Sequence, residues 1–344
     1  MQAPIIHSVH FSDPLFQRSI AFASDLYPAN GSYHSDIAHH YFINAWVISE
    51  EETILGRVVA YENLNLNHDE SAKENQKVLL IGNYECVNRP EIAQQLIQAI
   101  IDFAAVREYT KIIGPISGST WDNYRFKTRL SRPFLGEAIN QDYYANQWKS
   151  NGFKDIATYY SAMDGRLEFH NDSIVQREKE LTKQGTTIRP IDINLFESEL
   201  QKIHRFNQSA FSQNEFFTPI SEEDFIAKYQ RIKSLIDPYW VEMVEDVDHH
   251  LVGYIFAYED RLDPSSETVV LKTVARSSKR EYRGLGLVLA RRLNEKAIKR
   301  GKKQIVHAYM HQKNASLHCS ETMHGTSFAE YQLFELSLSP INPQ

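Results

Sequence analysis

The fold of this chain is indicated most directly by the stretch Arg283-Gly284-Leu285-Gly286-Leu287-Val288, which lies between an expected strand and an expected helix. Only 14 glycines occur among 344 residues, so two of them around a single leucine suggest a local requirement of the backbone. At a helix N-terminus, small residues let backbone N–H groups approach an anion, which the helix dipole also attracts. The stretch therefore predicts a pyrophosphate loop, although a glycine pair before a helix can also form an ordinary tight turn.

Spacing excludes two other phosphate-binding loops, and charge supports an anionic ligand. A dinucleotide fingerprint needs a third glycine, and a Walker A loop needs Gly-Lys-Ser/Thr. Between Arg276 and Lys303 there are eleven basic and two acidic residues, so this segment carries +9 within a chain of net charge −7. Such a block would steer an anion toward the loop. For Lys296, Lys299 and Lys303 we prefer the interpretation of a solvated helix face.

The elements around this loop occur twice along the chain. One hairpin opens with Trp46-Val47 and the other with Trp240-Val241, and both are rich in β-branched and aromatic residues. Each hairpin is followed by an apolar strand, a helix and a short strand, expected at 78–84, 90–106 and 111–113, and again at 269–274, 286–299 and 304–310. Apolar residues recur every four positions in both helices, which predicts one buried stripe on each.

Two α+β halves follow from this repeat. We expect an N-terminal domain over residues 1–165 and a C-terminal domain over 187–344. The segment 166–186 is polar and contains Arg177-Glu178-Lys179-Glu180, so we interpret it as a linker.

The C-terminal half resembles a known family. The run Leu271-Lys272-Thr273-Val274-Ala275-Arg276, then Glu281 to Gly286, then Ala297-Ile298-Lys299-Arg300-Gly301 resembles the acyl-CoA-binding motif of the GNAT superfamily of N-acetyltransferases. The resemblance covers about Ile188 to Leu338, and in the first half it extends through Tyr143-Tyr144, Gly152-Phe153 and Tyr159-Tyr160. It implies a tandem GNAT protein with two α/β/α units, each a mixed, mostly antiparallel central sheet flanked by helices.

The resemblance also implies where acetyl-CoA, or another acyl-CoA, would bind. In that family the strand before the loop pairs with pantetheine, which assigns Thr273, Val274 and Ala275 to this role. Loop amides hold the pyrophosphate, which assigns Arg283, Gly284, Leu285, Gly286, Leu287 and Val288. Asn314 falls at the family's asparagine, which contacts the pantetheine arm or orders a turn. Val288 replaces the usual small residue, so its side chain would crowd the cofactor.

The catalytic groups are less clearly marked. The family usually takes its proton donor from a tyrosine about seven residues after the asparagine, and Glu321 stands at that position here. The remaining candidates for donor are Tyr309, His318 and Tyr331. Glu267, which precedes the strand, and Glu242, in the hairpin, are candidate bases, and deprotonation through water is an equal alternative. The N–H of Val274 or Ala275 is the expected oxyanion contact.

The N-terminal half lacks the glycine loop. Its corresponding segment, Glu85 to Glu91, has no glycine, and Pro90 removes a donor, so we predict that this half does not bind CoA. The turn from Gly114 to Phe126 is polar and aromatic. It would either line a substrate cleft between the halves or serve as a structural loop anchored by Trp121 and Tyr124.

Composition limits the remaining functions. Cys86 and Cys319 cannot form a disulfide framework, and no signal peptide or membrane span is evident, so we expect a reduced, cytoplasmic protein. The net charge of −7 argues against a duplex nucleic-acid binder. We interpret the residues Asp246, Asp248, His249 and His250 as a solvated hairpin turn and expect no metal site. Cys319 beside His318 is a sequence neighbour rather than a nucleophilic pair.

These observations lead to one main function and two alternatives. The main prediction is an acyl-CoA-dependent N-acyltransferase that moves acetyl from acetyl-CoA to a primary amine by direct attack in a ternary complex. The acceptor would be a small-molecule amine or a peptide. The alternatives are a non-catalytic module that binds an acyl-CoA or a partner protein, and an RNA binder that uses the basic helix. The sequence leaves the acceptor, the acyl length and homo-oligomer formation open.

Overall fold

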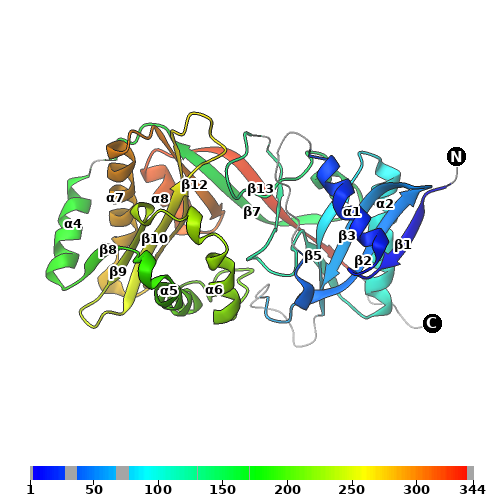
Figure 1. Cartoon of the computed structure of the whole chain (residues 1–344), viewed down its shortest axis with the longest axis horizontal. Helices are drawn as coiled ribbons and strands as arrows, with labels where there is room; N and C mark the ends of the chain where they lie inside the picture. Colours follow the sequence, from blue (N-terminus) through cyan, green and yellow to red (C-terminus); the bar gives the residue numbers. More distant parts are fainter. Residues whose placement is uncertain (1–2, 28–36, 67–76, 130, 170, 339–344) are drawn as a thin grey trace. The chain divides into compact units, whose positions relative to one another are not determined.

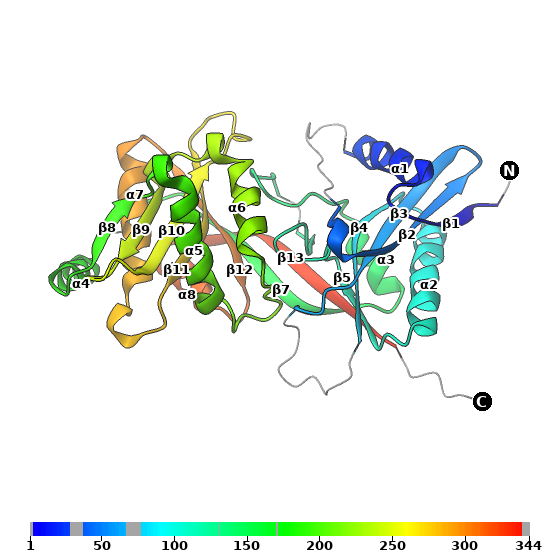
Figure 2. The same ribbon diagram turned by 60° about the horizontal axis from the view of Figure 1, so that its bottom comes forward.

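The computed structural model describes residues 3–27, 37–66, 77–129, 131–169 and 171–338 (Figures 1 and 2). These residues contain thirteen β-strands and eight α-helices. They divide into two compact units. Unit 1 comprises Met1–Leu130, Ala138–Thr158 and Glu330–Gln344, and unit 2 comprises Ser131–Glu137 and Tyr159–Ala329. The predicted α+β class is confirmed, with mixed, mostly antiparallel strands and flanking helices in each unit.

Unit 1 is built on the first hairpin of the repeat. Its strands lie in the order β1 (Ile5–Val9), β2 (Phe42–Glu50), β3 (Thr53–Tyr61), β4 (Val78–Cys86), β5 (Lys111–Gly114) and the end of β13 (Thr326–Ser337), which β6 (Phe126–Lys127) also pairs. Its helices are α1 (Pro14–Asp25), α2 (Pro90–Val106) and α3 (Tyr144–Ser150). The predicted stripe of α2, from Ile92 to Ala104, is fully buried against β2–β4.

Unit 2 repeats this plan. Its strands lie in the order β7 (Lys154–Asp164), β12 (Gln304–His311), β11 (Thr268–Arg276), β10 (Leu251–Glu259), β9 (Val241–Glu245) and β8 (Thr187–Pro190). Its helices are α4 (Asp172–Lys183), α5 (Phe196–Ala210), α6 (Glu222–Gln230), α7 (Leu285–Lys299) and α8 (Ala315–Thr322). Figure 2 shows α5 and α6 on one side of these strands and α7 on the other. No helix in the described part of the chain has the length and hydropathy needed to cross a bilayer.

The division between the units differs from the expected boundaries in several places. Ser131–Glu137 and the residues from Tyr159 to Gly165, expected in the N-terminal domain, belong to unit 2. The expected linker contains α4, which packs on α7 and buries Ile174 and Leu181 in the core of unit 2. These two apolar residues are seven positions apart, and the residues between them are mostly charged. The composition of the segment therefore resembles that of a linker, although the helix has a buried side. Residues from Glu330 onward belong to unit 1, because β13 pairs with β5 there, for example through Glu335 and Ile113. Both β7 and β13 therefore contribute residues to each unit.

Candidate functional site

The glycine loop forms the N-terminus of α7. Gly284 is the N-cap and has a φ of +84°, a left-handed conformation that glycine adopts without strain. A Cβ atom added to Gly286 would meet only Val274 Cγ2, at 4.0 Å, so space lies open beside its backbone. The N–H groups of Leu285, Gly286 and Leu287 belong to the first turn, where a helix provides no acceptors. The loop thus offers three donors next to an open space.

Val288 does not belong to this set. Its N–H donates to Gly284 O at 3.1 Å, and its side chain is fully buried in the core beneath α7. The expected role of Val288 in holding pyrophosphate is therefore not supported by the geometry. The expected crowding by its side chain is absent for the same reason, because a residue four positions after the cap points into the core.

Arg177 of α4 holds the loop in place from the side of the expected linker. Its Nε donates to Arg283 O at 2.8 Å, and its Nη2 donates to Glu281 O. Its stem lies beside Gly284, whose added Cβ would be 3.2 Å from Arg177 Cγ. Because two carbonyls before α7 are held in this way, the loop is fixed by a residue about one hundred positions earlier in the chain. Sequence spacing gives no signal for this contact.

A gap opens between β11 and β12 directly before the loop. The two strands are paired in parallel from Thr268 and Gln304 to Leu271 and His307, and the pairing ends there. Further along, β12 pairs with β7 through Met310 and His311. On its other edge β11 stays paired with β10, with a register shift at Lys272. The last residues of β11 therefore have one edge free of β12.

Alternation along β11 decides which backbone groups face the gap. Ser277 donates its N–H to Val252 O of unit 2 at 2.8 Å, so this residue faces β10. In an antiparallel pair alternate residues face the partner strand. Thr273 and Ala275 therefore also face β10, whereas Val274 and Arg276 face the gap. Of the three residues expected to pair with a cofactor through their backbone, only Val274 is positioned to do so.

The charge of this region is divided along α7. Arg276, Lys279, Arg280 and Arg283 are exposed around the loop, and the described residues place no carboxylate in an ion pair with any of them. Farther along, Arg291 and Arg292 bind Glu178, and Arg292 and Lys296 bind Glu242. Lys296 thus pairs with a buried carboxylate rather than forming a solvated face. The loop thus keeps four exposed cations that form no ion pair with the described residues.

The four catalytic candidates lie in different places. Tyr309 of β12 lies beside the gap: its hydroxyl donates to Gly136 O at 2.9 Å, and Lys272 Nζ lies 4.3 Å from its ring centroid. Tyr331 is buried in unit 1, and His318 is exposed on α8. Glu267 precedes the far end of β11 and pairs with Lys303. At about 3.3 Å per residue it lies roughly 23 Å from Val274, too far to act on a group held there.

Two further residues, Glu242 as a base and Asn314 as a cofactor contact, were expected to belong to the site. Glu242 is buried and bound by Arg292 and Lys296, so it is not available as a base. Asn314 is the N-cap of α8 and is exposed.

His307, which sequence reasoning did not select, lies buried where β11 and β12 separate, and its Nδ1 is 2.8 Å from Ser320 Oγ. Burial lowers the pKa of His307 to about 4, so it is neutral at pH 7.

Comparison with known proteins supports the fold. No family model and no curated protein matches the sequence. Among solved structures, a tandem GNAT protein from the clavulanic acid biosynthesis pathway is 10% identical and has a TM-score of 0.54, covering 99% of this chain and 100% of that one. Eis1 from Mycobacterium abscessus is 10% identical, with a TM-score of 0.52 and coverage of 97% and 73%. The chain has a tandem GNAT fold.

One similar structure is much longer than this chain. It is a GCN5-related glucosamine N-acetyltransferase region in a fungal multi-domain GH3 β-N-acetylglucosaminidase, 13% identical, with a TM-score of 0.60. The match covers 97% of this chain but 38% of that protein. At these identities the likeness concerns the fold, so the resemblance to GNAT proteins is confirmed at that level. GNAT folds typically bind acyl-CoA.

The first GNAT unit has the same strand separation but a filled gap. Here β4 and β5 pair only from Val78 to Leu80, and Cys86 pairs with Gly56 as Arg276 pairs with Gly253 in the second unit. The N–H of Cys86 donates to the Tyr144 hydroxyl at 3.1 Å, and its carbonyl accepts from the Tyr143 hydroxyl at 2.9 Å. In unit 1, side chains at the start of α3 therefore bond the backbone groups of Cys86, whose counterparts in unit 2 face the open gap.

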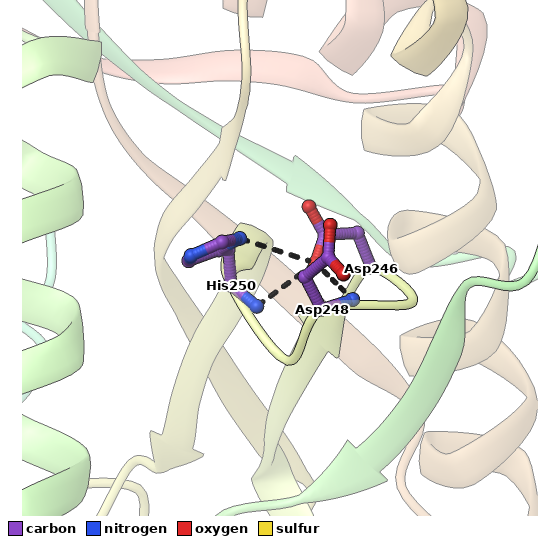
Figure 3. A group of neighbouring side chains, drawn as sticks. All are labelled: Asp246, Asp248 and His250. Atoms are coloured by element: carbon purple, nitrogen blue, oxygen red, sulfur yellow. Dashed lines mark hydrogen bonds and ion pairs between the residues drawn. The ribbon is translucent and has the colours of Figure 1, made fainter.

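The hairpin turn of the second GNAT unit brings Asp246, Asp248 and His250 together (Figure 3). One oxygen of Asp246 accepts the N–H groups of Asp248, at 3.0 Å, and His250, at 2.9 Å. The carboxylate thus closes the turn through hydrogen bonds to its own backbone, as aspartate commonly does. The side chains of Asp248 and His250 are exposed. We assign no metal to this turn.

Proposed function

We propose that this protein is an acyl-CoA-dependent N-acyltransferase that binds its cofactor in unit 2. The observation that carries the proposal is a combination found among the described residues: three N–H groups without a helical acceptor, an open space at Gly286 and four cations that form no ion pair near one helix terminus. Arg283 to Leu287 would hold the pyrophosphate, and the strand edge at Val274 would hold pantetheine. The reaction would transfer acetyl from acetyl-CoA to a primary amine of a small molecule or a peptide.

The residues at the gap supply the groups that acyl transfer needs. The bound cofactor would supply an activated acyl group as a thioester. The N–H of Val274 faces the gap and would donate a hydrogen bond to the acyl carbonyl oxygen, stabilising negative charge that develops there. Tyr309 carries a hydroxyl proton close to the same strand and is our proposed donor to the leaving sulfur. We assign the deprotonation of the amine to water.

We propose that unit 1 does not bind this cofactor. Tyr143 and Tyr144 already bond the backbone of Cys86 in its gap, and Gln147 Nε2 donates to Val87 O at 3.0 Å. A cofactor would have to displace three hydrogen bonds that are made within the unit.

A second candidate function, a non-catalytic acyl-CoA-binding module, is favoured by Glu321, an exposed carboxylate at the position of the family's usual tyrosine.

Titration calorimetry of the full chain with acetyl-CoA tests the proposed site. We expect one molecule to bind per chain with a Kd between about 1 μM and 1 mM, the usual range of enzyme–substrate KM values. Release of free CoA in the presence of an amine panel then separates the two functions, because only a transferase consumes the thioester. Absence of binding at several millimolar would contradict both.

Arg177 provides a second prediction. Because it fixes two loop carbonyls without facing the gap, we expect Arg177→Gln to raise the KM for acetyl-CoA about tenfold, the effect of losing a charged hydrogen bond. We expect kcat to stay within about twofold, since the reacting groups lie elsewhere. Lys179→Gln, an exposed change on the same helix, is the matched control. A fall in kcat with an unchanged KM would show that Arg177 does not act through the loop.

A further inference from the structure

We infer that a small cavity in unit 2 takes the alkyl part of an acyl group longer than acetyl, so that the preferred donor is a short-chain acyl-CoA such as butyryl-CoA. The cavity has a volume of about 30 Å³ and lies between α5, α6, β10 and β11. Phe196 and Leu200 line it from α5, Phe225 and Tyr229 from α6, and Phe256 and Thr273 from the strands. The inference rests on the function proposed above.

The lining suits an uncharged, apolar group. None of the described residues that line the cavity carries a charge at neutral pH, and burial raises the pKa of Tyr229 to about 12. The Tyr254 hydroxyl, which also lines it, already donates to Asn207 Oδ1 at 2.9 Å. The polar groups of the wall are the hydroxyls of Tyr229, Tyr254 and Thr273, and its other eight lining side chains are apolar, so most of the wall suits an apolar ligand.

The position of the cavity connects it with the proposed site of transfer. Thr273 forms part of its wall, and the next residue is Val274, whose N–H faces the gap. Consecutive Cα atoms are about 3.8 Å apart, so the cavity begins one residue from the proposed contact with the acyl carbonyl. In the binding mode that we infer, an alkyl chain attached to that carbonyl would pass Thr273 to enter the cavity.

Charge and size distinguish the acyl chain from the acceptor. A primary amine carries an ammonium group before it reacts, and the cavity presents no carboxylate to it. One water needs roughly 10–15 Å³ of such volume, so about 30 Å³ accommodates about two further carbon atoms. Butyryl has two more carbon atoms than acetyl. The cavity therefore matches a short alkyl chain and is too small for a long one.

Calorimetry with free CoA, acetyl-CoA, propionyl-CoA, butyryl-CoA and hexanoyl-CoA tests this inference on the full chain. We expect the affinity to rise about fourfold per added methylene up to butyryl, equivalent to about 0.8 kcal/mol each, and to rise no further with hexanoyl. Equal affinity for acetyl-CoA and butyryl-CoA would overturn the inference and leave the proposed function standing. Failure of every thioester and of free CoA to bind would instead overturn the proposed function, and the inference with it.

A matched pair of variants tests whether the alkyl chain of the acyl group lies in this cavity. Ile236 lines the cavity, whereas Ile298 is 55% exposed on α7. We expect Ile236→Phe to fill the space and remove the advantage of butyryl-CoA over acetyl-CoA, and Ile298→Phe to leave the advantage unchanged. Binding of free CoA reports whether each variant is folded. If a folded Ile236→Phe protein still bound butyryl-CoA more tightly than acetyl-CoA by the wild-type factor, the alkyl chain would lie elsewhere and the inference would be refuted.

Discussion

Gly286→Glu is expected to weaken acetyl-CoA binding by at least about 100-fold, which corresponds to about 2.7 kcal/mol. The first atom of the new side chain has room, because its nearest neighbour would be Val274 Cγ2 at 4.0 Å. The carboxylate would then lie among the N–H groups of Leu285, Gly286 and Leu287 and take the place of the phosphate oxygens. It would also repel the remaining phosphates in a region whose attraction depends on positive charge.

Two control variants separate this effect from a change in folding or in total charge. Gly286→Ala keeps the site neutral and should stabilise α7 by up to about 1 kcal/mol, because alanine favours helices more than glycine. Ile298→Glu adds the same single negative charge on an exposed face near the other end of α7. Thermal unfolding should show all three variants folded, and calorimetry should show that only Gly286→Glu has lost the ligand. Unchanged binding in a folded Gly286→Glu protein would refute the proposed cofactor loop.

Glu242→Ala is expected to destabilise unit 2 by about 3–5 kcal/mol at pH 7. Glu242 is 2% exposed and accepts from Arg292 Nε at 3.0 Å, from Arg292 Nη2 at 2.7 Å and from Lys296 Nζ at 2.7 Å. Removing this carboxylate leaves two cations beside a buried strand without their main partner. Urea unfolding measures the loss. Glu295→Ala, which removes a 58% exposed partner of Arg291, should cost no more than about 1 kcal/mol.

The destabilisation should depend on pH in a defined direction. Burial alone would raise the pKa of Glu242, but the hydrogen bonds from Arg292 and Lys296 outweigh it, so the pKa lies below its usual value. A carboxyl group with a lowered pKa stabilises the folded state above the unfolded pKa of about 4.3 and loses that contribution as the pH falls through the folded value. The difference between wild type and Glu242→Ala should therefore be constant near neutrality and shrink in acid. A difference that grows in acid would contradict this electrostatic account.

The local elements of the site could be predicted from sequence, whereas its long-range contacts could not. The four-residue spacing of apolar residues predicted the buried face of α7, which consists of Leu285, Leu289, Leu293 and Ala297. The glycine pair marked the start of this helix, and both signals lie within a few residues. Arg177 contacts the loop across about one hundred positions, and its neighbours suggested a solvated linker. The selection of Val274 over Thr273 and Ala275 depends on the register of β11 against β10, which spacing along one strand does not fix.

The sequence also could not decide which of the catalytic candidates lie close to the gap. Tyr309 and Tyr331 are both strand tyrosines, but the structure places Tyr309 beside the gap and Tyr331 in the core of unit 1. Glu267 was selected because it is close to the strand in sequence. A strand is extended, however, so its two ends are far apart, and nearness along the chain places this residue at the wrong end.

The crossing of β13 from unit 2 into unit 1 has a consequence for protein synthesis. Lys111 of β5 and Glu335 of β13, which form an ion pair in unit 1, are 224 positions apart. At roughly 5–20 residues per second, a ribosome makes the second of them about 10–45 s after the first. During that interval β5 has an unpaired edge, the kind of surface on which chains associate wrongly. The domain that is translated first is therefore completed last, and its exposure to aggregation depends on how quickly the rest of the chain is made.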